Sequence, residues 1–144
     1  MSTPDAPKST TANTSPALYK AYIAAINAQD WATVESFVND TVTHNSTRLS
    51  KQEYCNLMIS AFEACPDFTF SIDRLVVNEE AGDVACRIML EGTPVKAFLG
   101  FGGTEGEGRK VRFAEHVFYA WEGGRIVRVW SLLDLEQVKK QLGG

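Results

Sequence analysis

One carboxylate, Glu115, stands among apolar residues in the second half of the chain. Side chains alternate along a β-strand, so every second residue of the strand predicted over 111–121 shares a face with Glu115. The other members of that face are Val111, Phe113, Val117, Tyr119 and Trp121. Desolvation raises the pKa of a carboxyl that faces an apolar cavity, which suits it to proton transfer near neutral pH. Glu115 is therefore the first candidate for a catalytic acid/base, and the alternative is a structural ion pair with Arg87 or Arg112.

Four further polar residues could assist such a base. His44 and Asn45 end a short β-branched stretch and could hold or protonate a carbonyl oxygen, although a histidine bonded to backbone groups is the alternative. Asp134 follows the last predicted strand and either caps the next helix or acts at the site. Arg87 could orient a carboxylate or an enolate, and an outward salt bridge is the alternative.

The opposite face of the same strand carries His116. It lies there with Phe118, beside Arg128 and Trp130 of the following strand. Large aromatic side chains on the outer face of a sheet are typical of subunit interfaces, so His116 is either catalytic or an interface histidine. A bulge in this hairpin would exchange the two faces. We also expect Tyr119, Trp130 and Ser131 to contact a substrate.

Helical signals precede these strands. Ser15-Pro16 predicts the start of a first helix, and Asp30 caps a second that ends near Asn39-Asp40. Ser50 and Glu53 form a capping box for a third helix over 51 to about 64, which Pro66 ends. The β-branched stretch 41–45 predicts a short strand between the second and third helices.

Alternating hydrophobicity replaces the helical period after Pro66. The predicted strands cover residues 68–77, 84–90, 96–101, 111–121 and 125–133, and Asp134 begins a last helix. Glycine-rich residues 102–108 predict a flexible loop, which we expect to act as a lid rather than to bind phosphate. These elements predict an α+β fold: a cone-shaped roll in which a curved, mostly antiparallel sheet wraps around three N-terminal helices, with a short C-terminal helix. Residues 1–15 are expected to form a disordered tail and 16–144 one domain.

Composition narrows the function further. The net charge of −4 argues against a nucleic-acid partner. No apolar run reaches the roughly 18–20 residues of a membrane span, and the N-terminus lacks a secretory signal, so we expect a cytoplasmic protein without a membrane partner. Three cysteines lack the spacing of a zinc or redox motif, and we expect reduced, packed thiols and no metal site.

Several short segments carry a family resemblance between about residues 66 and 142. They are Pro66-Asp67-Phe68, Gly92-Thr93, Phe98-Leu99-Gly100, Thr104, Glu115-His116-Val117-Phe118-Tyr119, Gly124-Arg125-Ile126 and the run Val129-Trp130-Ser131-Leu132-Leu133-Asp134. In order and spacing these segments resemble the SnoaL-like polyketide cyclases, a branch of the nuclear transport factor 2-like superfamily. The resemblance implies a homodimer and a cofactor-free, metal-free ring closure, such as an aldol condensation, in a polyketide-like small molecule.

The chain departs from that family pattern at two positions. Ser131 stands where the family's aldol cyclases carry an acid/base aspartate, and Val117 stands where a pocket histidine is expected. Serine is too weakly basic to replace a carboxylate directly, so Glu115 becomes the expected proton acceptor, with His44 or Asp134 as its partner. Lactone or pyrone formation is then a variant of the ring closure. The remaining alternatives are a non-catalytic module that binds a small molecule or a protein, and a hydrolase or dehydratase on the same scaffold.

Overall fold

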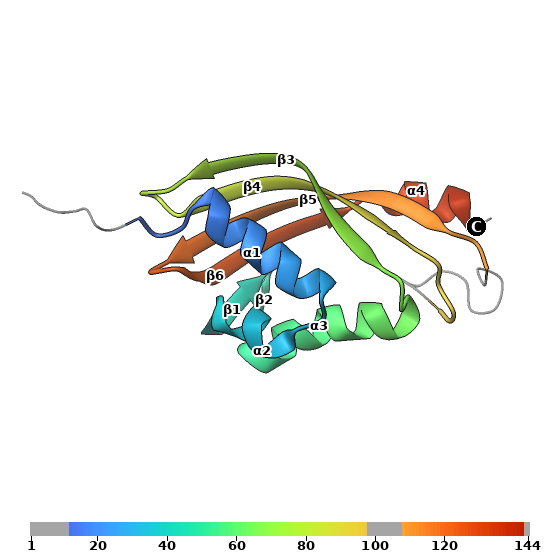
Figure 1. The fold of residues 1–144 in the computed structure, drawn as a ribbon, viewed down its shortest axis with the longest axis horizontal. Coiled ribbons are helices and arrows are strands. Elements are labelled where there is room, and N and C mark those ends of the chain that lie inside the picture. Colours follow the sequence, from blue (N-terminus) through green and yellow to red (C-terminus); the bar gives the residue numbers. More distant parts are fainter. Residues whose placement is uncertain (1–11, 98–107, 143–144) are drawn as a thin grey trace, which may run out of the picture.

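A curved sheet arches over three helices (Figure 1). We describe the protein from a computed structural model, which describes residues 12–97 and 108–142. Its helices are α1 (Pro16–Asn27), α2 (Trp31–Ser36), α3 (Lys51–Ala64) and α4 (Leu135–Gln141). Its strands are β1 (Val38–His44), β2 (Thr47–Ser50), β3 (Thr69–Asn78), β4 (Asp83–Gly92), β5 (Val111–Glu122) and β6 (Arg125–Leu133).

The helices begin at the predicted capping residues. Ser50 Oγ accepts a hydrogen bond from the Glu53 backbone N–H at 3.1 Å, and Glu53 Oε1 accepts one from the Ser50 N–H at 2.8 Å. This reciprocal capping box starts α3, whose range was predicted correctly. Asp134 caps α4 through a hydrogen bond from the Gln137 N–H at 3.1 Å. Local sequence therefore set these helix starts, because capping needs only residues three apart.

The six-stranded sheet has the order β2-β1-β6-β5-β4-β3. Its pairs are antiparallel except for β1 and β6, which run parallel. The prediction was wrong in this region: α2 ends at Ser36, β1 begins at Val38 rather than at residue 41, and β2 was not predicted. Long-range pairing extends β1, since the Ile126 N–H donates to the Phe37 carbonyl at 2.8 Å and Val38 is fully buried.

The β5–β6 hairpin contains a register shift at its turn end. Ala120 pairs with Arg128, but the next residue, Trp121, pairs with Ile126, so Val127 is the extra residue on β6. Because the shift lies beyond Tyr119, it does not alter the face on which Glu115 lies. The face predicted for Glu115 is therefore confirmed.

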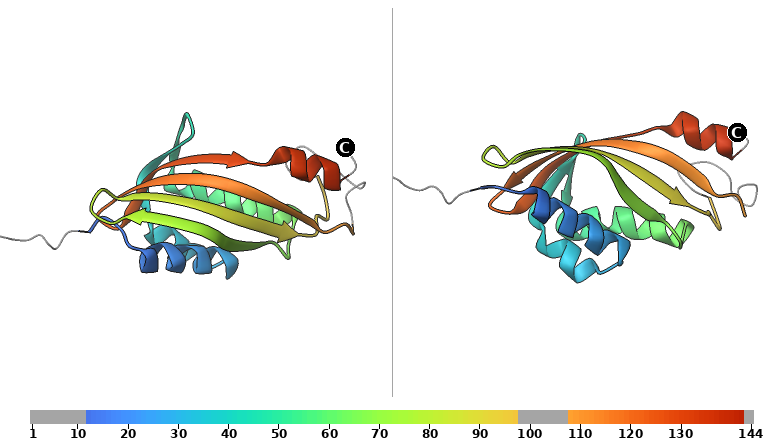
Figure 2. Two further views of the ribbon diagram at one scale, coloured as in Figure 1. Left: turned by 90° about the horizontal axis from the view of Figure 1, so that it is seen from above. Right: turned by 45° about the horizontal axis from the view of Figure 1, so that its top comes forward.

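The α+β prediction is confirmed by the arrangement of layers. Helices α1, α2 and α3 lie on the concave side of the sheet, and α4 lies apart from them after β6, beside the first residues of β5 (Figure 2). Gln137 Oε1 ties α4 to β5 by accepting from the Ala114 N–H at 3.0 Å. All three cysteines are buried with free thiols. No helix in the described ranges has the length and apolar character that crossing a membrane requires.

Three predictions concern the parts beyond the described ranges. Of the tail expected over 1–15, residues 1–11 lie outside the described part, whereas Asn13 is bonded to the turns after β3 and β5 and Thr14 is fully buried. The ordered chain therefore begins before residue 16. A strand was predicted over 96–101. Lys96 and Ala97 are not part of a β-strand, and the other four residues lie outside the described ranges. The glycine loop lies outside them as well, apart from Gly108.

Candidate active site

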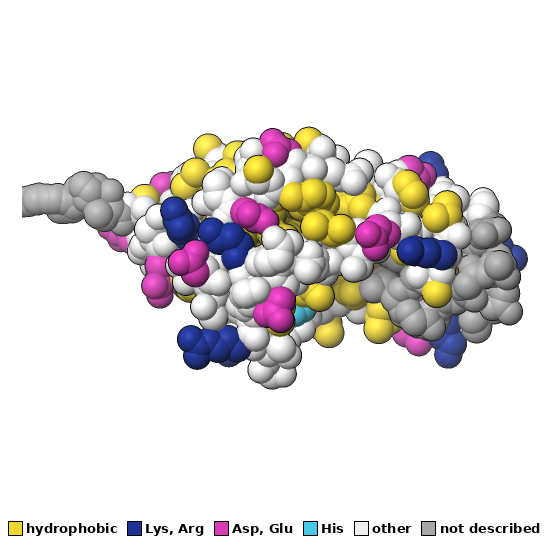
Figure 3. Space-filling view, turned by 90° about the horizontal axis from the view of Figure 1, so that it is seen from below, with side chains coloured by type: hydrophobic (Ala, Val, Ile, Leu, Met, Phe, Trp, Pro, Cys, Tyr) yellow, Lys and Arg dark blue, Asp and Glu magenta, His cyan; other side chains and the backbone are white. Residues whose placement is uncertain are grey.

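A cavity of about 300 Å³ lies between the concave face of the sheet and helices α1 and α3. This volume is at the lower end of the range for small-molecule sites. Leu57 lines the cavity and is 47% exposed, so the cavity reaches the surface beside α3. Seen from below, hydrophobic side chains gather in the middle of this face and charged ones lie around them (Figure 3). The lining residues are Tyr22, Ile23, Ile26, His44, Tyr54, Leu57, Met58, Ala61, Phe68, Phe70, Ile88, Leu90, Phe113, Glu115, Tyr119, Val129, Ser131 and Leu133.

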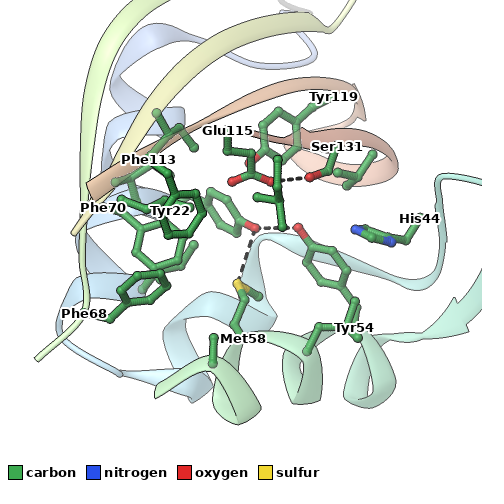
Figure 4. Close-up of a pocket in the computed structure, with 18 residues that line it drawn as sticks. Tyr22, His44, Tyr54, Met58, Phe68, Phe70, Phe113, Glu115, Tyr119 and Ser131 are labelled. Atoms are coloured by element: carbon green, nitrogen blue, oxygen red, sulfur yellow. Dashed lines mark hydrogen bonds between the residues drawn. The ribbon is translucent and has the colours of Figure 1, made fainter. Parts of the chain in front are cut away.

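The cavity has an apolar end and a polar end (Figure 4). Phe68, Phe70 and Phe113 form the apolar end, with the rings of Phe68 and Phe70 5.3 Å apart and edge to face. The polar end collects Glu115 and Ser131 from the sheet with the hydroxyls that α1 and α3 contribute. A ligand with one apolar part and one oxygen-bearing part matches this division, because each part would meet groups of its own kind.

Glu115 is the carboxylate of the cavity. It lies on β5 between two buried residues of the same face, Phe113 and Val117. Ser131 Oγ donates a short hydrogen bond to Glu115 Oε2. Burial raises the pKa of Glu115, and the Ser131 hydrogen bond lowers it by a smaller amount. Among the residues that the structure describes, no Lys, Arg or His side chain forms an ion pair with Glu115.

The two arginines considered as partners of Glu115 are bonded elsewhere. Arg87 donates from Nη1 to Asp73 Oδ2 at 2.6 Å. The Arg112 side chain is largely exposed, and its Nε lies 3.4 Å from Glu91 Oε1. The alternative of a structural ion pair is therefore wrong for both residues, and the carboxyl of Glu115 faces the cavity without a neutralising cation from either.

Asn45 holds Ser131 in place. Its Oδ1 accepts a hydrogen bond from the Ser131 backbone N–H at 2.8 Å, and its own N–H donates to the Val129 carbonyl at 2.8 Å. Asn45 has a φ of 54°, a left-handed conformation that asparagine tolerates better than most residues. Asn45 is exposed and does not line the cavity, so it supports the site through Ser131 rather than facing a ligand.

His44 lines the polar end at the last position of β1. Its ring centroid lies 6.2 Å from that of Tyr54. Partial burial lowers the pKa of His44, which favours the neutral imidazole at pH 7. Of the two partners expected for Glu115, His44 and Asp134, only His44 lines the same cavity. A neutral imidazole there can accept or donate a hydrogen bond.

One tyrosine pair completes the polar end, and a second pair reaches the cavity only through Tyr119. Tyr22 Oη and Tyr54 Oη lie 2.7 Å apart, and Tyr19 Oη donates to Tyr119 Oη at 3.3 Å. Tyr119 lines the cavity as predicted, but the sequence reasoning did not single out Tyr54 or the neighbouring Met58. A signal was present, since residues 54, 58 and 61 recur on one face of α3. That stripe indicated burial, without indicating which cavity the residues would line.

The other predicted residues lie on the outer face of the sheet. His116 is exposed and accepts a hydrogen bond from Arg87 Nε at 3.2 Å. Trp130 is 42% exposed. The guanidinium carbon of Arg128 lies over its ring, 4.7 Å from the ring centroid of Trp130. Asp134 is exposed and borders an outer groove with His116. The structure therefore separates His116, Arg87, Trp130 and Asp134 from Glu115, because alternate side chains of a strand point to opposite faces.

The arrangement provides one protonatable carboxylate, one imidazole and several hydroxyls around an apolar space. Such a set can move a proton to or from a ligand and bind oxygen atoms of that ligand. Within residues 12–97 and 108–142, no group of three or more His, Cys, Asp or Glu side chains is placed to hold a metal ion.

Comparison with known proteins agrees with the fold. The family model for the SnoaL-like polyketide cyclases matches residues 17–142. A SnoaL-like polyketide cyclase from Agrobacterium tumefaciens is 34% identical, with a TM-score of 0.80 over 88% of this chain and 95% of that one. Its similarity in sequence extends over most of both proteins.

Two more distant structures share the fold. IdmH, a proposed polyketide cyclase from Streptomyces antibioticus, is 20% identical with a TM-score of 0.75, covering 89% of this chain and 97% of that one. AclR, a proposed hydroxylase from Streptomyces galilaeus, is 22% identical with a TM-score of 0.74, covering 88% and 93%. The search of curated proteins found no match. From the family match and the cone-shaped fold around this cavity, we conclude that the chain belongs to the SnoaL-like polyketide cyclase family.

Proposed function

We propose that the protein is a cofactor-independent cyclase or isomerase that closes a ring in a polyketide-type small molecule, with Glu115 as proton acceptor. The observation that carries the proposal is the position of Glu115: its carboxyl faces an apolar cavity and is held by Ser131. Burial raises its pKa toward the range in which a general base works best near neutral pH. Membership of a cyclase family supports the same reaction class.

The contact between Glu115 and Ser131 also accounts for the departure from the family pattern. Ser131 occupies the position at which the resemblance expects the acid/base aspartate, and the carboxyl of Glu115 reaches its hydroxyl from the neighbouring strand. The Glu115 carboxylate, although it belongs to β5, therefore lies beside the position on β6 at which the family's aspartate is expected. Asn45 fixes the Ser131 backbone, so the hydroxyl that holds Glu115 is itself anchored.

The proposed reaction begins with removal of a proton from the carbon next to a carbonyl. Glu115 takes the proton, and the electron pair of the C–H bond forms the enolate. The enolate carbon then attacks a second carbonyl in an aldol closure, and the resulting alkoxide takes up a proton. In a lactone closure the enolate oxygen attacks an ester or thioester carbonyl, the bond to the alkoxide or thiolate breaks, and this leaving group takes the proton held by Glu115. His44, which lines the same polar end, is placed to supply or accept a proton at the acceptor oxygen. The apolar end would hold the non-reacting part of the substrate.

Benzoylacetone, a phenyl-substituted β-diketone, offers a direct test of proton transfer. Its keto and enol forms differ in ultraviolet absorbance, so the rate of their interconversion can be measured with and without the protein. Acid/base groups typically contribute about 10²- to 10⁴-fold to a rate, and Glu115→Gln should lose an acceleration of that order. Glu122→Gln, an exposed glutamate at the end of the same strand, is the matched control. A folded Glu115→Gln variant with the wild-type rate would refute the assignment of the base.

We also propose that the protein forms a homodimer through the outer face of β5 and β6. Phe118, Trp130 and Leu132 are 58%, 42% and 73% exposed, and Phe118 pairs directly with Trp130 across the two strands. Contiguous exposed apolar side chains of this kind are typical of subunit interfaces. Light scattering should give twice the chain mass for the wild type and a single chain mass for Phe118→Ser combined with Leu132→Ser. A monomeric wild type would refute this proposal without affecting the first.

A further inference from the structure

A short hydrogen bond between two tyrosine hydroxyls lies in the cavity, apart from the bond between Glu115 and Ser131. Tyr22 Oη of α1 and Tyr54 Oη of α3 are 2.7 Å apart, and both side chains line the cavity. Tyr22 is 1% exposed and Tyr54 is 5% exposed. Figure 4 shows the two hydroxyls between the Glu115 carboxyl and the Met58 side chain. Hydroxyls buried this well are oriented by their surroundings before any ligand arrives.

The Tyr22–Tyr54 pair has one hydroxyl hydrogen that is not used within the pair and can bond to a ligand. A phenol donates one hydrogen, so only one of the two hydroxyls donates within the pair. Among the described residues, the Tyr22 hydroxyl has a second neighbour, Met58 Sδ at 4.0 Å, whereas the Tyr54 hydroxyl has Tyr22 as its hydrogen-bond partner. A thioether sulfur is a weak acceptor. When Tyr22 donates to Tyr54, the hydrogen of Tyr54 is free to meet an acceptor in the cavity.

We propose that Tyr54 donates this hydrogen to the oxyanion formed when Glu115 deprotonates the substrate, and that Tyr22 positions and polarises Tyr54. This inference rests on the proposed function, because an enolate must form for the oxyanion to exist. The C–H electron pair becomes the new carbon–carbon π bond, the carbonyl π pair moves to oxygen, and Glu115 holds the proton. The negative charge on oxygen then meets a donor that was in place before the reaction began.

The two groups stand on opposite walls of the cavity. Glu115 is on β5, and Tyr54 is on α3 across from it, so a substrate between helix and sheet would have the base on one side and the donor on the other (Figure 4). Burial raises the pKa of Tyr54, the hydrogen bond from Tyr22 lowers it, and the charge of Glu115 raises it again. The phenol therefore stays protonated as a donor at neutral pH, and Tyr22 opposes the effect of burial.

The second tyrosine pair provides an internal comparison. Tyr19 Oη and Tyr119 Oη are 3.3 Å apart, which exceeds the usual range of roughly 2.5–3.0 Å for a hydroxyl–hydroxyl hydrogen bond. Tyr19 is fully buried and does not line the cavity. Tyr19→Phe thus removes a hydroxyl from a buried tyrosine pair without removing one that faces a ligand, and it is the matched control for Tyr54→Phe.

Enolisation of benzoylacetone gives the first test. A hydrogen bond to a charged group affects an equilibrium or a rate by about 10- to 100-fold. We expect Tyr54→Phe to lower kcat and kcat/KM together by that factor, because the bond is made mainly to the oxyanion. Tyr22→Phe should lower both by about 2- to 5-fold, the effect of a neutral hydrogen bond acting through Tyr54. Tyr19→Phe should stay within about 2-fold of the wild type. Thermal unfolding of the three variants checks that each remains folded.

Binding of para-nitrophenol gives a second test that needs no turnover. The nitrophenolate ion resembles a planar enolate, and its absorbance differs from that of the neutral phenol. The measurement uses Glu115→Gln, in which a neutral amide stands for the protonated carboxyl after proton transfer. Adding Tyr54→Phe to this variant should raise the Kd for nitrophenolate about 10- to 100-fold and reduce the ionised fraction of the bound probe. Adding Tyr19→Phe should change neither.

The outcomes separate this inference from the proposed function. Loss of enolisation in Glu115→Gln but not in Tyr54→Phe would leave Glu115 as the base and overturn the role of Tyr54. An unchanged nitrophenolate Kd on adding Tyr54→Phe would overturn it as well, and so would a Glu115→Gln protein that does not bind the probe. If Glu115→Gln kept the wild-type rate, the proposed function would fail, and the nitrophenolate comparison alone would decide whether Tyr54 binds an oxyanion.

Discussion

Replacing Glu115 by glutamine should change how the stability of the fold depends on pH. Burial raises the pKa of Glu115 in the folded protein, whereas a glutamate in an unfolded chain has a pKa of about 4.3. Between these two pKa values the unfolded state binds fewer protons than the folded state. The free energy of unfolding therefore falls as pH rises through this window and becomes level above the folded pKa. Glu115→Gln removes this fall, because an amide does not titrate.

The size of the effect follows from the single group involved. One titrating carboxyl changes the slope by at most about 1.4 kcal/mol per pH unit, and each unit by which the folded pKa exceeds the unfolded one contributes about 1.4 kcal/mol in total. At low pH the two proteins should be nearly equal in stability, since the amide oxygen of glutamine can still accept from Ser131. At higher pH the variant should be the more stable. In Ser131→Ala the fall should be larger and extend to higher pH, because the hydrogen bond that lowers the Glu115 pKa is absent.

Urea unfolding, followed by the fluorescence of the buried Trp121, measures this difference between about pH 4 and pH 8. The m-values should agree between the proteins, so that the comparison reports stability rather than a changed unfolded state. His44 is present in both proteins, and its contribution cancels in the difference. Glu122→Gln controls for exchanging a carboxyl for an amide on the same strand. A difference between Glu115→Gln and wild type that does not vary with pH would refute the assignment of Glu115 as a buried, titrating group.

Three further predictions concern the surroundings of the site. Because burial lowers the pKa of His44, the wild type should lose stability relative to His44→Gln as pH falls below about 6.5, as measured by urea unfolding at each pH. Gly92→Ala should destabilise the fold by about 1–3 kcal/mol, since a Cβ there would lie 2.4 Å from Cys65 Sγ. In a double-mutant cycle, Cys65→Ala should reduce the cost of Gly92→Ala, because it removes the clashing sulfur. Additive effects of the two substitutions would contradict the clash. Asn45→Ala should destabilise by about 1–2 kcal/mol and slow benzoylacetone enolisation, because it removes the bond to the Ser131 N–H. Asn45→Gly removes the same bond but tolerates the positive φ, so it should slow enolisation equally and destabilise less than Asn45→Ala.

The candidate base was found from the sequence because its signal is local. Alternation along residues 111–121 places Glu115 with Phe113 and Tyr119, and this holds wherever the strand sits in the fold. The capping box of α3 and the capping residues that begin α1 and α4 are local in the same sense. Such features involve residues close in the chain, so their geometry follows from backbone period and from hydrogen bonds between near neighbours.

The role of Ser131 depended on strand register. Glu115 pairs with Leu133 and Val117 pairs with Ser131, so Glu115 and Ser131 are diagonal neighbours on one face. A shift of one residue would have turned the serine to the outer face and left the carboxyl without its hydrogen bond. The sequence alone could show that serine replaced an expected aspartate, but not that a glutamate from the next strand would reach it.

By itself, the sequence determined that this chain forms an α+β fold with a carboxylate on an apolar strand face. Tertiary structure alone decided which groups share the cavity with that carboxylate. Asp134 and His116 were reasonable partners by chain position, yet they lie on the outer face, whereas Tyr22 and Tyr54, 32 residues apart, meet at 2.7 Å inside. The physical reason is that a helix packed on a curved sheet brings together side chains whose separation depends on packing angle and register, and neither quantity is encoded within a single element.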